Sequence, residues 1–331
     1  AQGEGAARFV NGVLRAFLRA GETEIEGDDT ESLAVRWSHP RWMIERWLDE
    51  GGVALVDAAA AANNTPAPLT VRPAGSAPDR AALMERLEAE GATVRPAQFA
   101  PDAVQFEGLR APFDGKTFRD GWWAVQDEAS QLVVQLLDPQ PGEKIWDICA
   151  APGGKSAYMA RLMGGEGRIL VTDIHREKIK TLATLLKDPI YTVKRHDGMT
   201  LVTEAVFDRV LLDAPCTGLG VVRRHPEIRW RREPSDIVER AELQGALLAN
   251  AAKAVLPGGV LVYSVCSDAP EEGVDQIAPF LAQNPDFAVE SPSEGSIPWA
   301  QVTDGGCLRL RPHVHGADGF FAVRFRHRGA P

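Results

Sequence analysis

The sequence predicts an α/β protein whose main domain is a parallel sheet with helices on both faces. From Gly142 onward, short apolar runs alternate with helical stretches, and regular alternation of this kind is typical of a parallel sheet. Residues 63–127 mix short strands with a helix, which predicts a small α+β module, and residues 1–62 show helical periodicity. We therefore expect three domains or segments, spanning 1–62, 63–127 and 128–331.

The individual elements follow from spacing and from their terminating residues. The first helix carries Phe9, Val13, Leu14 and Phe17 on one side, and a second helical stretch after Pro40 is expected to end at Gly51–Gly52. In the module we expect strands at 69–72 and near Val94 and Val104, and a helix at 80–90. In the main domain we expect strands at 144–150, 168–174, 191–197, 207–213, 259–267 and 319–325, and helices at 154–163, 176–187 and 235–255.

The composition is that of an ordinary globular protein. Hydrophobic residues make up 44% and charged residues 25% of the 331 positions, so a normal core is expected. There is no membrane-length apolar run and no basic segment leading into an apolar one, which predicts a cytoplasmic protein without membrane association. The four cysteines (Cys149, Cys216, Cys266 and Cys307) form no C-x-x-C pair, so we expect neither a metal site nor a disulfide.

A glycine-containing turn connects the first strand of the main domain to its helix. The segment 146–156 leaves the strand, turns at Gly153–Gly154 and enters the helix, so backbone amides can approach a carboxylate or phosphate. Cys149 stands where a Walker A loop needs glycine, and the G-x-G-x-x-G pattern is absent. Asp173, Asp197 and Asp213 end the next three strands, where together they suit one adenosyl-sized ligand.

Three motifs carry a resemblance to a known family. They are CAAPGGK at 149–155, DAPCTG at 213–218 and YSVCS at 263–267, and they resemble the Nol/Nop/Sun family of RNA cytosine-5 methyltransferases. The segments RRHPEIRW at 223–230, QDEASQL at 126–132 and DGFFAVRF at 318–325 also fit, and the first of them narrows the resemblance to the bacterial ribosomal RNA branch. The resemblance covers nearly the whole chain.

The resemblance implies a Rossmann-like methyltransferase domain preceded by a small RNA-recognition-like module. It implies S-adenosylmethionine as cofactor and ribosomal RNA, of the 16S type, as partner, and we expect a monomer. The residues that it places around the cofactor are Cys149, Ala150, Ala151, Pro152, Gly153, Gly154, Lys155, Asp173, Asp197 and Asp213.

The chemistry that the resemblance implies explains why two cysteines would stand at adjacent strand ends. Carbon 5 of cytosine becomes reactive only after a thiolate adds to carbon 6. The residues alone leave open which cysteine attacks, and whether both are inert core residues. The resemblance implies that Cys266 is the nucleophile and that Cys216 assists product release. Asp213 is a candidate acid for ring nitrogen 3, if it is protonated or shares a proton.

The sequence departs from the family pattern in two places. Bacterial members usually carry an N-terminal helical domain resembling the antitermination factor NusB, and residues 8–15 look like the end of that domain, so we expect the rest to be missing. Val265 replaces the usual Thr before the nucleophile, which removes a hydroxyl group near the thiolate.

RNA contacts are predicted where positive charge is concentrated, although the net charge is −10. The candidate residues are Arg223, Arg224, His225, Arg229, Arg231 and Arg232; the alternative is a solvated charged loop. Trp122 and Trp123 are either base-stacking surfaces or core residues. The target base must be unstacked to react. Alternative functions are methylation of transfer RNA or another RNA, a non-catalytic RNA-binding assembly factor, and a small-molecule methyltransferase.

Overall fold

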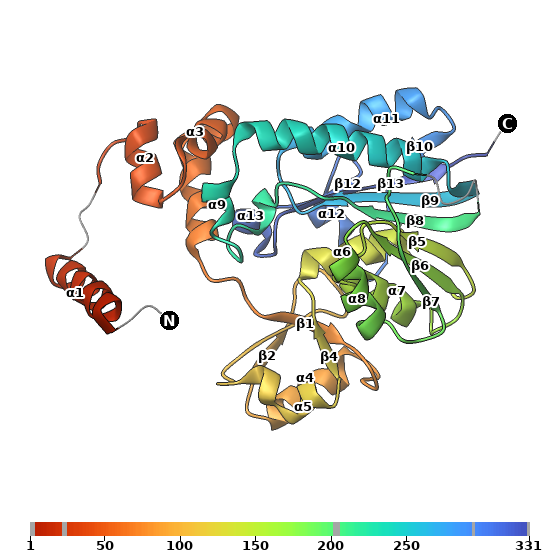
Figure 1. Ribbon diagram of the computed structural model, residues 1–331, viewed down its shortest axis with the longest axis horizontal. Helices are drawn as coiled ribbons and strands as arrows, with labels where there is room; N and C mark the ends of the chain where they lie inside the picture. Colours follow the sequence, from red (N-terminus) through yellow and green to blue (C-terminus); the bar gives the residue numbers. More distant parts are fainter. Residues whose placement is uncertain (1–3, 22–24, 201–205, 293–294, 330–331) are drawn as a thin grey trace. The chain divides into compact units, whose positions relative to one another are not determined.

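The computed structural model describes residues 4–21, 25–200, 206–292 and 295–329. The chain divides into two compact units, 1–61 and 62–331. The helices that begin in the first unit are α1 (Glu4–Ala20), α2 (Thr30–Trp37) and α3 (Arg41–Asn64) (Figure 1). The expected end at Gly51–Gly52 is instead a local kink, where Gly52 has φ 67° and the helix then resumes, because glycine adopts positive φ without steric cost.

The small module is a four-stranded antiparallel sheet with helices on one side. Its strands are β1 (Thr70–Pro73), β2 (Thr93–Pro96), β3 (Val104–Glu107) and β4 (Trp123–Val125), in the order β2-β3-β1-β4. Its helices are α4 (Arg80–Ala89), η1 (Pro112–Asp114) and α5 (Lys116–Arg119). Leu83 and Leu87 of α4 pack in one apolar cluster with Trp123. Trp123 is only 3% exposed, so it is a core residue and not a base-stacking surface.

The larger sheet has the order β11-β12-β13-β9-β8-β5-β6-β7, with β10 paired to β13. Its parallel strands are β5 (Lys144–Asp147), β6 (Arg168–Asp173), β7 (Tyr191–Arg195), β8 (Phe207–Asp213) and β9 (Val255–Val265). The remaining strands are β10 (Phe287–Val289), β11 (Thr303–Asp304), β12 (Cys307–Leu310) and β13 (Phe320–His327). The prediction of a parallel sheet is confirmed for β5–β9, but it is wrong for the edge that contains β13, which runs antiparallel to β9.

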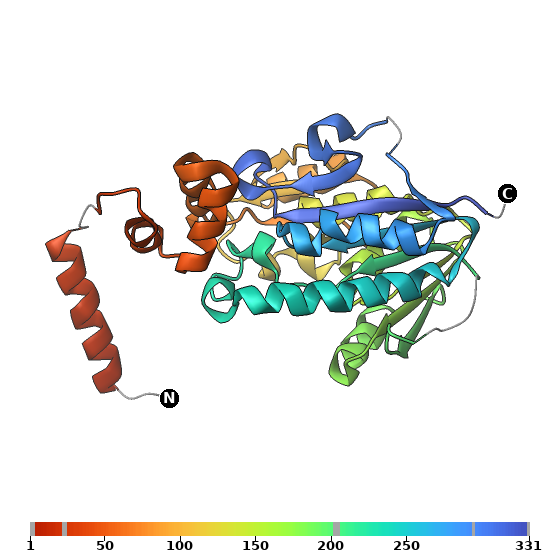
Figure 2. The ribbon, with the colours of Figure 1, turned by 90° about the horizontal axis from the view of Figure 1, so that it is seen from above.

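Helices cover both faces of this sheet, as predicted (Figures 1 and 2). They are α6 (Glu128–Leu137), α7 (Gly154–Leu162), α8 (Arg176–Leu185), α9 (Ile228–Arg231), α10 (Pro234–Ala252), α11 (Ile277–Gln283), α12 (Trp299–Val302) and α13 (Pro312–His315), with short turns η2 (Leu219–Val221), η3 (Pro270–Glu272) and η4 (Val274–Gln276). One apolar cluster lies between the sheet and α6, α7 and α8, and a second lies between the sheet and α10 and α11. Strands of the sheet are therefore buried on both faces, which is typical of parallel sheets.

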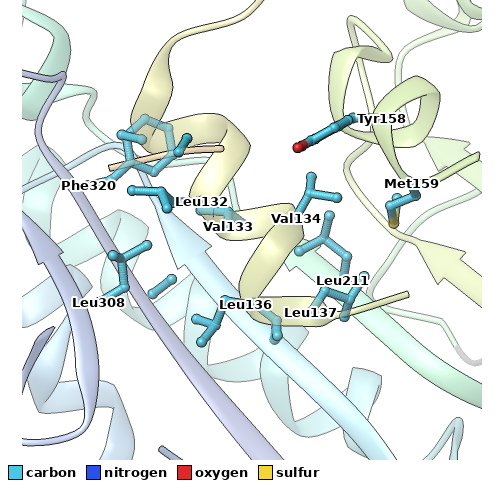
Figure 3. Packing of buried hydrophobic residues seen from close by; sticks show 14 of the residues in the cluster. Leu132, Val133, Val134, Leu136, Leu137, Tyr158, Met159, Leu211, Leu308 and Phe320 are labelled. Carbon is cyan, nitrogen blue, oxygen red and sulfur yellow. The ribbon is translucent and has the colours of Figure 1, made fainter. Parts of the chain in front are cut away.

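Helix α6 is the centre of the first cluster. Figure 3 shows Leu132 and Leu136 lying toward Leu308 and Phe320, while Leu137 lies toward Leu211. Burying one such side chain stabilises the fold by roughly 1.5–3 kcal/mol.

Two buried arginines from the sheet hold the carboxyl end of α6. Arg209 Nη1 donates to the carbonyl oxygen of Leu137 at 2.5 Å, and Arg324 Nη1 donates to that of Leu136 at 2.7 Å. Positive charge at a helix C-terminus is favourable because the last carbonyl groups carry partial negative charge. The helix is thereby fixed across β8 and β13.

Candidate active site

The ends of four neighbouring parallel strands bring the predicted site residues together. Strand β5 ends at Asp147, β6 at Asp173 and β8 at Asp213, and Asp213 pairs with Ser264 near the end of β9. Because β5, β6, β8 and β9 are parallel neighbours, their carboxyl ends lie along one edge of the sheet. Cys266 directly follows β9 at this edge.

The two cysteine sulfur atoms face each other at this edge. Cys216 Sγ lies 3.2 Å from Cys266 Sγ, and both residues are half-buried. The hydrogen bond to Cys266 and burial raise the pKa of the Cys216 thiol well above its usual range, and the charges of Glu272 and Asp213 add to the effect. The structure therefore favours the protonated form of Cys216, and its thiol lies within hydrogen-bonding distance of the Cys266 sulfur.

A buried ion pair stands beside the sulfur atoms. Lys155 Nζ donates to Asp213 Oδ2 at 2.7 Å, and Ser264 Oγ donates to Asp213 Oδ1 at 2.7 Å. Burial lowers the pKa of Lys155, but the attraction of Asp213 and Cys266 outweighs it and the net shift is upward. Lys155 was expected only as part of the cofactor loop; its ammonium group in fact reaches Asp213 and is a positive charge next to Cys266.

The loop between β5 and α7 has the geometry of a ligand-binding turn. Gly153 has φ 103°, and a Cβ at this position would lie 2.8 Å from Leu182 Cδ2, so only glycine fits. The first amides of α7 have no acceptor within the helix and are available to a carboxylate. Arg72 of the small module donates to the carbonyl oxygen of Gly154 at 3.0 Å and lies over the ring of Tyr158, which holds the start of α7 in place.

The carboxyl groups of Asp147 and Asp173 lie beside this turn. They suit a ligand that combines a nucleoside with an amino acid. Asp147 is fully buried; its Oδ2 accepts from Ser156 Oγ at 2.6 Å, while its Oδ1 has no hydrogen-bond partner among the described residues. Burial raises the pKa of Asp147 to about 7. Asp173, 4% exposed, accepts from the backbone N–H of His175 at 2.9 Å. A free buried acceptor, a carboxylate at the tip of β6 and the amides of α7 match the ammonium, ribose and carboxylate groups of S-adenosylmethionine.

The remaining predicted cofactor residue lies farther from its strand than expected. Strand β7 ends at Arg195, so Asp197 is in the following turn, where its exposed carboxylate accepts from the backbone N–H of Met199 at 3.0 Å. Its contact with the adenine ring stays a prediction.

The arginine segment is divided between the interior and the surface. Arg223 Nε donates to Asp318 Oδ1 at 2.8 Å, and Arg224 Nη2 donates to Asp127 Oδ2 at 2.7 Å. Arg229 is buried and donates to Asn64 Oδ1 at 2.8 Å. These three guanidinium groups already bind partners within the protein, and their contact with RNA phosphates stays a prediction.

The other basic residues of the segment face outward. His225 and Arg231 are exposed, as is Trp230 between the arginines, with 63% of its surface accessible. Arg232 is half-buried, and its Nε donates to the carbonyl oxygen of Thr217, the residue after Cys216, at 3.0 Å. His225, Arg231 and Arg232 therefore remain candidates for RNA contact.

Val265 stands where the family usually has threonine, and its apolar surroundings suit a valine side chain. Val265 is fully buried in the apolar cluster beneath α10 and α11. Cys307 is also buried in that cluster, where it packs as a small apolar side chain.

Neither a metal cluster nor a membrane span is found in the described part of the chain. Residues 4–21, 25–200, 206–292 and 295–329 contain no group of three or more histidine, cysteine or acidic side chains arranged to hold a metal ion. Within the same ranges, no helix has the length and hydropathy needed to cross a bilayer.

The fold and the strand-end site together define a Rossmann-like methyltransferase domain. Comparison with known proteins identifies the family. The family described as 16S rRNA methyltransferase RsmB/F matches residues 134–326, and the ferredoxin-like domain of RsmF/B-like methyltransferases matches residues 39–111. The chain belongs to the RsmB/F family of rRNA methyltransferases and is S-adenosylmethionine-dependent.

Named relatives and solved structures agree with this family. The chain is 36% identical to the probable ribosomal RNA small subunit methyltransferase B of Bacillus subtilis over 98% of its own length and 75% of the relative. It is 37% identical to ribosomal RNA small subunit methyltransferase B of Salmonella paratyphi A, covering 96% of this chain and 72% of the relative. A methyltransferase homolog protein from Pyrococcus horikoshii superposes with a TM-score of 0.76 at 25% identity, covering 91% of this chain and 99% of that one.

Proposed function

We propose that this chain methylates carbon 5 of a cytosine in small-subunit (16S) ribosomal RNA, with Cys266 as the covalent nucleophile. The observation that carries the proposal is the 3.2 Å separation of the Cys216 and Cys266 sulfur atoms at adjacent strand ends. The paired Lys155 and Asp213 stand beside them. Two inert core cysteines would need no such ion pair and no position at the ligand-binding edge.

In the first step, the Cys266 thiolate forms a bond to carbon 6 of the cytosine. The Lys155 ammonium group stabilises the thiolate before attack, since positive charge favours the ionised sulfur. As the ring gains electrons, Asp213 and Lys155 neutralise ring nitrogen 3, with the shared proton coming from Lys155. S-Adenosylmethionine, held by the turn before α7 and by Asp173, supplies an electrophilic methyl group for carbon 5.

In the second step, the product leaves the enzyme. A water molecule accepts the proton from carbon 5, and the electron pair of that C–H bond forms the double bond to carbon 6. The bond to Cys266 breaks with both electrons on sulfur, and ring nitrogen 3 returns its proton to the Lys155–Asp213 pair. Cys216 donates its S–H proton to the departing sulfur. The raised pKa of the Cys216 thiol and its 3.2 Å contact with the Cys266 sulfur support this assignment of roles, which the residues alone left open.

Ribosomal RNA is proposed as substrate because the named relatives are small-subunit methyltransferases. An unpaired cytosine suits the chemistry, since a stacked base cannot reach Cys266. We propose that His225, Arg231 and Arg232 contact the RNA and that Trp230 offers a stacking surface. We further propose that the chain acts as a cytoplasmic monomer and that its domains span 1–62, 63–127 and 128–331.

Trapping of the covalent intermediate tests the proposal. The chain is incubated with S-adenosylmethionine and RNA that contains 5-fluorocytosine, whose fluorine cannot leave as a proton, so the adduct accumulates. We expect a denaturant-stable complex with 16S rRNA fragments and none with transfer RNA. A complex with transfer RNA alone would move the substrate to that class. Absence of a complex with any RNA, while calorimetry shows cofactor binding, would contradict the covalent mechanism.

A further inference from the structure

We propose that Glu272 is a positioning residue that holds the two cysteine loops at their working separation. The expected effect of Glu272 on methylation rests on the proposed function, but its expected effect on the separation of the two sulfur atoms does not. Glu272 ends η3, is fully buried, and was not singled out by the sequence.

One carboxylate contacts the residue after each cysteine. Thr217, which follows Cys216, donates its backbone N–H to Glu272 Oε1 at 2.8 Å and its hydroxyl to Oε2. Ser267, which follows Cys266, donates its hydroxyl to Oε2 at 2.6 Å. The carboxylate therefore connects the loop after β8 to the loop after β9 immediately next to the sulfur atoms.

The carboxylate is itself fixed by neighbouring elements. Gln244 of α10 donates Nε2 to Glu272 Oε1 at 3.0 Å and to the carbonyl oxygen of Pro215 at 3.0 Å. The single hydroxyl proton of Tyr263 in β9 is shared between the backbone carbonyl of Glu272 and Gln244 Oε1, which lies 3.1 Å away. The helix, the strand and both cysteine loops thus converge on Glu272.

The position of the Glu272 side chain suits a group that accepts hydrogen bonds and donates none. Four neutral donors converge on the two oxygen atoms, and they offset the cost of burying the charge. A glutamine would present an NH2 group to one side and would have to turn hydroxyl groups around to avoid meeting donor with donor. The negative charge has a second effect, because Glu272 is one of the groups that raise the pKa of the Cys216 thiol.

The separation of the sulfur atoms is measured by the equilibrium between the dithiol and a Cys216–Cys266 disulfide. Cys266 attacks glutathione disulfide and releases one glutathione thiol; Cys216 then attacks the mixed disulfide and releases the second. Two electrons pass from the cysteines to glutathione. Near neutral pH, the equilibrium constant gives the effective concentration of one cysteine thiol relative to the other. This concentration is high when the two sulfur atoms are held at a separation that suits a bond. Peptide mass spectrometry identifies the Cys216–Cys266 bridge.

The variants are Glu272→Gln and Ser267→Ala, with Glu128→Gln as the matched control. Glu128 is also buried and accepts backbone N–H bonds from Phe99 and Ala100, but it touches neither cysteine loop. We expect the effective concentration to fall at least about tenfold in both Glu272→Gln and Ser267→Ala and to stay at the wild-type value in the control. In methylation assays, kcat should fall by about 10- to 100-fold, as for small misplacements of reacting groups, with an unchanged KM for S-adenosylmethionine.

An unchanged effective concentration in Glu272→Gln and Ser267→Ala, or an equal fall in the control, would overturn the inference. Because Ser267→Ala keeps the buried charge and most of the hydrogen bonds, it decides the question if Glu272→Gln does not fold. If the wild-type chain forms no adduct with RNA, the proposed function fails, while the disulfide equilibrium still reports on Glu272.

Discussion

Cys216 Sγ and Cys266 Sγ lie 3.2 Å apart, although the two residues pack against different apolar clusters of the sheet. Cys266 contacts the cluster on the α6 side, and Cys216 contacts the cluster on the α10 side. The pair therefore meets where the two layers end, at the tips of β8 and β9. A change on either face can alter the distance between the sulfur atoms.

Substitution of each cysteine is expected to have a different result. Cys266→Ala should abolish both methylation and the covalent adduct, because the nucleophile is lost. Cys216→Ala should form the adduct with ordinary RNA and accumulate it, with release slowed by about 100-fold, a usual contribution of a general acid. Denaturing gels and single-turnover assays measure both effects. If Cys216→Ala alone blocked adduct formation, the roles of the two residues would be reversed.

Asp173→Ala should weaken binding of S-adenosylmethionine. Loss of a hydrogen-bonding carboxylate costs about 1.5–3 kcal/mol, or roughly a 10- to 100-fold rise in Kd. Isothermal titration calorimetry measures the change, and Asp304→Ala at the far edge of the sheet is the control. Equal affinity of Asp173→Ala and the wild type would remove Asp173 from the cofactor site.

Two arginines of one segment should behave differently. Arg231→Ala should weaken RNA binding without a change in thermal stability. The slope of log K against log salt concentration should become shallower by about 1, as expected for the loss of one phosphate contact. Arg224→Ala should instead destabilise the fold by a few kcal/mol, because it leaves Asp127 and Asp318 buried with one cation fewer. Filter binding across a salt series and thermal unfolding separate the two. Loss of RNA affinity in Arg224→Ala at full stability would restore it as an RNA contact.

The buried Asp147 should make stability fall as the pH rises. Burial raises its pKa from 3.8 to about 7, so between these values the folded chain keeps a proton that the unfolded chain releases. The free energy of unfolding should therefore decline between about pH 4 and pH 7, by a few kcal/mol, and level off above. Asp147→Asn should remove this decline, and Asp304→Asn should not. Urea unfolding at pH 5 and pH 8 tests this. If the free energies of unfolding of the wild type and Asp147→Asn differed by the same amount at both pH values, the prediction would be wrong.

Local periodicity predicted several of the longer elements, although the ten-residue helix α6 was not among them. The strand expected at 207–213 is β8 with the same bounds, since Val210, Leu211 and Leu212 form a short apolar run that is fully buried in the sheet. The short strands β10, β11 and β12 were not predicted, because two to four residues carry too little pattern. The antiparallel direction of β13 was also missed, because strand direction is decided by the sheet and not by side-chain alternation.

The candidate site was predicted unevenly for a similar reason. Cys216, Cys266 and Asp213 occur in recognisable motifs directly after strands. Glu272 stands in an ordinary acidic stretch, and its importance depends on Thr217 and Ser267, which reach it only after folding. No signal in the sequence alone distinguishes it from Glu271.

The sequence by itself determined which chemical groups stand at the strand ends, because a strand, a glycine turn and a helix start are set by neighbouring residues. Parallel strands then share one edge, so the order of the motifs was enough to bring the thiols and the cofactor turn together. Only the tertiary structure decided that the Cys216 thiol has a raised pKa, that Arg223 and Arg224 form ion pairs with Asp318 and Asp127, and that Lys155 pairs with Asp213. Protonation and ion pairing depend on burial and on charges from distant parts of the chain, which no local pattern contains.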